Sequence, residues 1–189
     1  MHTDPYDVHG QDLQHIVKRL DLEDRQVLFS TSKIAPDQLA VLYNLADVTV
    51  NISDAEGFGL ATLESLSCGT PIIANMTGGL QEQVVGAGDT YGIPIFPSSK
   101  SIIGSQQVPY IYEDRISRKD FLSALNKMYD MSFDERLEMG QRGHEYVKEN
   151  YNFSNFNKSW VDLMTKIYET EGSWETRTGY NGIRFKEVA

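Results

Sequence analysis

The feature that most constrains the fold is the stretch from Asp47 to Asn75, in which two short apolar segments flank a helix-like one. Residues 47–52 alternate at the two-residue period of a strand, and residues 71–75 (PIIAN) have the pattern of a short buried strand. Between them a glycine-bearing loop, SDAEGFG, leads into a helix predicted over residues 59–68. Because consecutive parallel strands need such a crossover, the stretch predicts one unit of a parallel α/β sheet.

The segments on either side continue this alternation. Short strands are expected over residues 26–30, 91–96 and 109–112, and helices over about residues 10–20 and from Pro36 onward. The segment between the last two strands, PSSKSIIGSQQ, has turn composition and is expected to be a loop.

From Ser117 onward the pattern is helical. Three apolar faces recur at helical spacing, and Trp160 and Tyr168 on the last of them are expected to pack. Ser132 and Glu135 have the spacing of a capping box at the start of a helix. The predicted fold class is therefore α/β, with a Rossmann-like parallel sheet flanked by helices and a helical C-terminus.

Composition excludes several classes of function. Lysine and arginine total 17 and aspartate and glutamate 27, so the net charge of −10 disfavours non-specific binding of nucleic acid. A single cysteine, Cys68, excludes an intrachain disulfide, and the four histidines lack metal-ligand spacing, so no metal site is expected. No apolar run is long enough to cross a bilayer, and no secretion signal opens the chain. These features favour a cytoplasmic location and leave peripheral membrane association open.

The loop EGFG is the first candidate for a binding site, because parallel α/β sheets bind ligands beyond the carboxyl ends of their strands. Gly57 and Gly59 let the backbone approach a ligand closely, and Phe58 between them can cover it. The amides of Phe58, Gly59 and Leu60 form the N-terminus of the predicted helix, which favours an anion such as a phosphate.

Two glutamates lie on either side of these three amides, which we call the anion seat. Glu56 lies in the loop, and on a helical wheel Glu64 falls inside the apolar arc that contains Leu60, whereas Thr62 and Ser65 fall on the predicted outer face. A carboxylate in that arc needs a hydrogen-bond donor, so Glu64 is expected to face a polar cleft. Carboxylates suit the vicinal hydroxyls of a sugar, which favours a phosphorylated sugar or nucleotide-sugar as ligand. An acid before a helix can equally be dipole complementarity, and GFG a plain turn.

The segment EGFGLATLESLSCGTPIIA resembles the signature of the family 4 retaining glycosyltransferases, which have the two-lobed GT-B fold. Glu56 and Glu64 match the family's Glu-x7-Glu pair. The following TGGLQE matches the family's Gly-Gly-x-x-Glu through Gly78, Gly79 and Glu82. The closing NYNFSNFNKSW resembles the family's C-terminal region, so the similarity in element order covers roughly residues 10–170.

The resemblance implies a role for each matched residue. Glu64 would bind the ribose hydroxyls of the nucleotide, and Glu56 would contact the transferred sugar and organise the reacting centre. The amides of Phe58, Gly59 and Leu60 would hold the diphosphate. The implied reaction is transfer of a hexosyl group from a nucleoside-diphosphate sugar with retention, without a metal or other cofactor, the departing phosphate taking the acceptor's proton.

Two departures from the family pattern shape the remaining expectations. The family's donor lobe opens with a strand whose Arg and Lys contact the diphosphate, and an acceptor lobe precedes it; neither has a counterpart here. Residues 1–170 are therefore expected to form only the donor-binding lobe, followed by a tail at 171–189. Such a chain would be inactive or weakly active alone and would need a companion acceptor lobe or a second copy. The alternatives are a non-catalytic module that binds sugar-nucleotides or a partner, and another GT-B enzyme such as a sugar phosphorylase.

Overall fold

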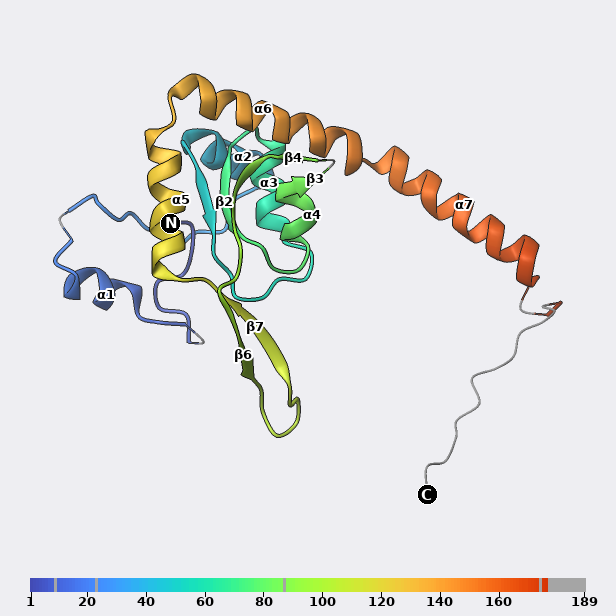
Figure 1. Ribbon diagram of the computed structural model, residues 1–189, viewed down its shortest axis with the longest axis horizontal. Helices are drawn as coiled ribbons and strands as arrows, with labels where there is room; N and C mark the ends of the chain where they lie inside the picture. The colour runs from blue at the N-terminus through green and yellow to red at the C-terminus, as the bar shows by residue number, and fades with distance from the viewer. Residues whose placement is uncertain (9, 23, 87, 174, 177–189) are drawn as a thin grey trace. The chain divides into compact units, whose positions relative to one another are not determined.

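The structure is a computed structural model that divides into two compact units, Met1–Leu42 and Tyr43–Ala189 (Figure 1). The described residues are 1–8, 10–22, 24–86, 88–173 and 175–176. Most of the predicted tail at 171–189 therefore lies outside the described residues, as does His9.

The first unit contains α1 (Leu13–Arg19) and most of α2 (Pro36–Leu45), both where helical spacing predicts them. The strand predicted over residues 26–30 is wrong, because the structure has an isolated parallel bridge there, between His2 and Ser30. Met1 and Thr3 form hydrogen bonds with Leu28 and Ser30 there, but a single bridge is too short to make a strand.

The second unit is built on a parallel sheet with the strand order β1 (Thr49–Asn51), β2 (Ile72–Asn75) and β5 (Gly92–Ile95). Ile73 of the central strand pairs with Val50 on one side and with Ile93 on the other. All four residues of β2 are buried, as its continuous apolar sequence predicts. Because the three strands run parallel, their carboxyl ends lie at one edge of the sheet.

Helices cover both faces of this sheet: α3 (Leu60–Ser67), α4 (Leu80–Val84), α5 (Arg118–Asp130) and α6 (Phe133–Asn150). On one face Leu66 of α3 and Leu80 of α4 pack with Ile72. On the other face Met128 of α5 packs with Ile73. The predicted α/β class, a parallel sheet flanked by helices, is confirmed.

The segment predicted as a loop contains a strand instead, β6 (Ser99–Ile103), which forms a hairpin with β7 (Ile111–Arg115), close to the strand expected over residues 109–112. Figure 1 shows this hairpin projecting from the sheet. Turn composition marks the hairpin's tip correctly, but it hides the strand before the tip, whose partner lies about ten residues further along the chain. A second, shorter ladder joins β3 (Val85–Gly86) to β4 (Asp89–Thr90).

The capping box predicted for α6 is confirmed. The Glu135 amide donates to Ser132 Oγ at 3.3 Å, and the Ser132 amide donates back to the Glu135 carboxylate at 2.7 Å. The two bonds satisfy donors that a helix start otherwise leaves without partners, which explains why α6 begins at Phe133.

The last helix, α7 (Phe153–Glu171), confirms the predicted helical C-terminus. The packing expected for Trp160 and Tyr168 is wrong within the described part of the chain, since none of the residues of α7 is buried. No described element covers the apolar side of this helix. Within the described residues, no helix combines the length and the apolar character needed to cross a membrane.

Candidate functional site

The loop between β1 and α3 interlocks with the glycine turn before α4, at the carboxyl edge of the sheet. The Gly79 amide donates to the Gly57 carbonyl at 2.9 Å, and Gln83 Nε2 donates to the Phe58 carbonyl at 2.5 Å. Gly78 adopts a φ of +50°, and a Cβ there would lie 1.8 Å from the carbonyl oxygen of Glu56. The two backbones therefore approach each other more closely than any residue with a side chain allows.

This interlocking sets the direction of the loop's amides. In a planar trans peptide the N–H points opposite to the C=O. The carbonyls of Gly57 and Phe58 face the α4 turn, so the N–H groups of Phe58 and Gly59 face away from it. Gly59 caps α3 with a φ of +81° and without a side-chain hydrogen bond, and no described residue accepts from the amides of Phe58, Gly59 or Leu60. These N–H groups, with the positive end of α3, form a seat for an anion.

Glu56 is held beside this seat by Asn51, at the carboxyl end of β1. Asn51 Nδ2 donates to Glu56 Oε1 at 3.2 Å and to Thr62 Oγ1 at 3.2 Å. Glu56 is half-buried, and its other carboxylate oxygen accepts no hydrogen bond from a described residue. The carboxylate thus has a defined position and retains an oxygen for a ligand.

Glu64 lies on the exposed side of α3, one helix turn beyond the seat. The Tyr43 hydroxyl donates to Glu64 Oε2 at 3.0 Å and also lies 3.3 Å from the Ala61 carbonyl oxygen. Burial, followed by the hydrogen bond and charge of Glu64, raises the pKa of the Tyr43 phenol far above its usual value. The phenol therefore stays protonated and remains a donor to Glu64.

Cys68 follows Glu64 by one turn at the end of α3 and is a free cysteine. Burial raises the pKa of its thiol, and the negative charge of Glu64 raises it further. The thiol is therefore held in its protonated, unreactive form.

The face of α3 that packs on the sheet is not the one predicted. Thr62 and Ser65, predicted on the outer face, are both 0% exposed, whereas Leu60 is 66% exposed. The reason is that β1 turns its polar side chains toward α3: Thr49 Oγ1 lies 2.6 Å from Ser65 Oγ, and Asn51 bonds Thr62. A helical wheel counts apolar residues, but the neighbouring strand decides which face is buried.

Sequence reasoning missed three residues that shape this site, namely Asn51, Tyr43 and Gln83. An asparagine is unusual in a strand, so Asn51 after Val50 was a usable signal. Tyr43 lies 21 positions before Glu64 and Gln83 lies 25 positions after Phe58, so no local pattern could connect either pair.

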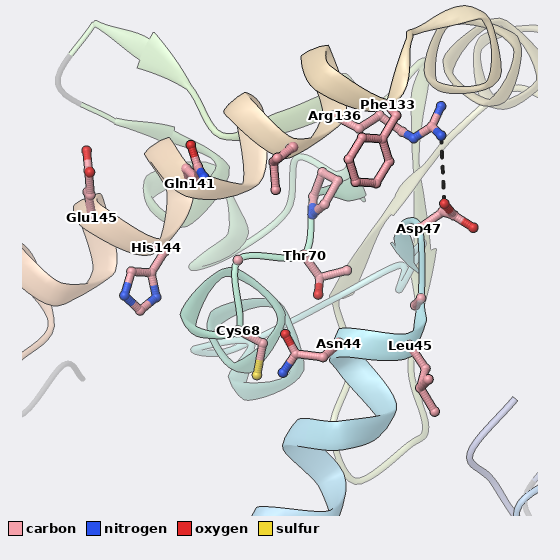
Figure 2. A pocket seen from close by; sticks show the side chains of 14 residues that line it. Asn44, Leu45, Asp47, Cys68, Thr70, Phe133, Arg136, Gln141, His144 and Glu145 are labelled. Carbon is pink, nitrogen blue, oxygen red and sulfur yellow. Dashed lines mark ion pairs between the residues drawn. The ribbon is translucent and has the colours of Figure 1, made fainter.

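A separate hollow of about 750 Å³ lies at the opposite edge of the sheet, between the end of α2, the turn after α3, and α6 (Figure 2). Arg136 and His144, which line it, both have partners: Arg136 approaches Asp47 at 3.7 Å, and His144 Nδ1 lies 2.6 Å from the Ser67 carbonyl oxygen. The C-terminal ends of α2 and α3 also present carbonyls there, which disfavours an anion. The EGFG loop is therefore the better anion site of the two.

The described residues include no group of three His, Cys, Asp or Glu side chains close enough to hold a metal ion. The expectation that the reaction needs no metal or other cofactor stays a prediction.

A family model for glycosyl transferases group 1 matches residues 9–124. The chain belongs to this family. A curated relative, N-acetyl-alpha-D-glucosaminyl L-malate synthase from Bacillus anthracis, is 30% identical over 122 residues, which are 65% of this chain and 30% of the relative. Alpha-monoglucosyldiacylglycerol synthase from Streptococcus pneumoniae is 29% identical over 168 residues, 84% of this chain and 34% of the relative. The chain thus spans about a third of the length of these glycosyl transferase relatives.

Solved structures support the same assignment. Sucrose-phosphate synthase from Thermosynechococcus elongatus superposes with a TM-score of 0.64 at 25% identity, over 89% of this chain and 37% of that one. The HepE protein of Anabaena, solved with UDP and glucose, gives a TM-score of 0.60 at 18% identity, over 82% of this chain and 36% of that one. The predicted resemblance to the GT-B glycosyltransferases is confirmed.

Proposed function

We propose that this chain binds a nucleoside-diphosphate sugar and forms the donor-binding part of a retaining hexosyltransferase. The observation that carries the proposal is the direction of the loop amides: the carbonyls of Gly57 and Phe58 bond to the α4 turn, which leaves the N–H groups of Phe58 and Gly59 for the diphosphate. The positive end of α3 offsets part of the negative charge of the leaving group.

In this proposal each of the two glutamates binds a different part of the donor. Glu64, held by the Tyr43 hydroxyl, accepts hydrogen bonds from the ribose hydroxyls. Glu56, held by Asn51, faces the transferred sugar, and its charge stabilises the positive charge that develops at the anomeric carbon. In a transfer with retention, the departing phosphate accepts the proton of the incoming acceptor hydroxyl.

Calorimetric titration with UDP, GDP and ADP tests the proposal directly. We expect one of the three to bind, and Glu64→Ala to weaken its binding about 10- to 100-fold, the loss expected when a charged hydrogen-bond acceptor is removed. Glu145→Ala is the matched control, because this exposed glutamate lines the hollow at the opposite edge of the sheet. Unchanged affinity of Glu64→Ala would count decisively against the proposal.

A donor-binding chain can also serve as a non-catalytic module. A turnover assay distinguishes this alternative from the proposed transferase. We expect donor hydrolysis or transfer that is lost in Glu56→Ala, while the affinity for the nucleoside diphosphate is retained. Binding without any turnover, alone or with a companion acceptor lobe, would support the non-catalytic alternative. The relatives are named for products as different as an L-malate conjugate and a glucosyldiacylglycerol, so the proposal concerns the donor and leaves the acceptor open.

A further inference from the structure

The β6–β7 hairpin, predicted as a loop without a function, is bonded at its base to the loop that carries Glu56. Arg115, the last residue of β7, extends its guanidinium to Asp54, two residues before Glu56, at 2.6 Å. The same guanidinium bonds Glu113 on the same face of the hairpin. Arg115 thus joins the hairpin to the loop by a charge-assisted hydrogen bond.

Further hydrogen bonds hold the backbone of Asp54 and of its neighbour Ser53. The Asp114 amide donates to the Asp54 carbonyl at 2.7 Å. Asn75, buried at the carboxyl end of β2, donates from Nδ2 to the carbonyls of Ser53 at 2.9 Å and Asp114 at 3.1 Å. The end of β2, the base of the hairpin and the loop before Glu56 therefore form one hydrogen-bonded cluster.

The cluster matters for Glu56 because the loop is short. Ser53 is held from the other side by Asn51, whose Oδ1 accepts from the Ser53 amide at 3.1 Å and whose Nδ2 bonds Glu56. Asp54 is thus the point at which the hairpin can fix the path of the chain toward Glu56. A guanidinium that bridges the two carboxylates of Asp54 and Glu113 suits this task, because its planar fork limits the geometry of the groups that it joins.

We propose that Arg115 is a positioning residue of the donor site: through Asp54 it fixes the loop that presents Glu56 to the transferred sugar, and it makes the hairpin part of the site. This inference rests on the proposed function for the role of Glu56, whereas the link between hairpin and loop stands on the contacts alone. We therefore expect Arg115 to affect the binding of the donor's sugar moiety and not the binding of its nucleotide.

Hydrogen exchange of the amides over residues 53–57 tests the link without any ligand. We expect exchange there to become about tenfold faster in Arg115→Gln and in Asp54→Ala, with no further increase in the double variant, because each change removes the bond between these two side chains. Lys100→Gln is the matched control, because Lys100 pairs with Asp114 at 3.6 Å on the other face of the hairpin. Unchanged exchange in both single variants, or additive effects in the double variant, would overturn the link.

Calorimetry then tests the role in the donor site, with UDP and UDP-glucose, GDP and GDP-mannose, and ADP and ADP-glucose as probes. We expect Arg115→Gln to bind the nucleoside diphosphate within twofold of wild type, and to lose at least fivefold in affinity for the matching nucleotide-sugar. Equal losses for both probes, or no loss for either, would overturn the positioning role. If wild type binds none of these probes, the proposed function fails, and the exchange result still decides whether the hairpin fixes the loop. Asp54→Ala removes the same bond from the loop side should Arg115→Gln fail to fold.

Discussion

Gly78→Ala is the substitution whose outcome most directly tests the geometry of the EGFG loop. A Cβ at this position would lie 1.8 Å from the carbonyl oxygen of Glu56 and 2.8 Å from its carbonyl carbon, both of them backbone atoms. The loop that presents Glu56 must then retreat by roughly 1.6 Å or more before ordinary van der Waals contact is restored. The substitution therefore moves the anion seat without removing any polar group from it.

The expected loss of folding stability in Gly78→Ala has two parts. The φ of +50° costs an alanine about 1–2 kcal/mol, and the overlap with Glu56 costs about 1–3 kcal/mol, the usual range for forcing extra atoms into packed structure. Gly88→Ala isolates the first part, since Gly88 has a φ of +84° and open space where its Cβ would be. The difference between the two variants is therefore the overlap alone, which corresponds to roughly 2–12 °C in Tm for a chain of this size.

Thermal unfolding and calorimetry together provide the assay. We expect Gly78→Ala to melt below Gly88→Ala by that margin and to bind the best nucleoside diphosphate at least about tenfold more weakly, because even a displacement of about 1 Å disrupts hydrogen-bond geometry, and this one is larger. Gly57→Ala, which has open space around its Cβ and no positive φ, should leave the melting temperature nearly unchanged. If Gly78→Ala and Gly88→Ala melt within about 2 °C of each other and bind equally well, the interlocked-loop geometry is refuted.

Three further predictions concern the surroundings of the site. Glu64→Gln should lower the pKa of the Cys68 thiol, because the charge of Glu64 helps to raise it, and alkylation by iodoacetamide at pH 8 should become roughly threefold faster; an unchanged rate would place Glu64 away from Cys68. Burial and the neighbouring Tyr146 raise the pKa of Tyr151 to about 12, so the folded chain holds this proton more tightly than the unfolded chain, whose tyrosines titrate near 10. The free energy of unfolding should therefore fall as pH rises from about 10 to 12, and Tyr151→Phe should flatten that fall in melting curves taken across this range; parallel curves would contradict this account. Ser132→Ala should cost about 1 kcal/mol in chemical denaturation by removing the capping box of α6, and a loss below about 0.3 kcal/mol would show that the box contributes little.

The fold class could be predicted because it depends on patterns that are local in the chain. The continuous apolar run of β2, the helical spacing after Pro36 and the Ser132–Glu135 pair each determine structure through residues a few positions apart. The same holds for the placement of EGFG, which directly follows a strand and directly precedes a helix. Parallel pairing then brings this loop to the edge of the sheet where α/β folds bind their ligands.

Predictions failed where a residue's surroundings come from distant parts of the chain. Composition indicated a loop before residue 109, but pairing of Ile103 with Ile111 and of Ser99 with Arg115 makes the segment a strand. The wheel for α3 placed Thr62 outside, because it could not include the polar side chains that β1 turns toward that helix.

The sequence by itself thus determined the parallel α/β class and the position of the EGFG loop between a strand and a helix, since periodicity and turn chemistry act between near neighbours in the chain. Only the tertiary structure decided the direction of the loop amides, the partners of Glu56 and Glu64, and the bond from Arg115 to Asp54. These features depend on hydrogen bonds between groups that folding alone brings together, such as Arg115 and Asp54, which are 61 positions apart in the chain.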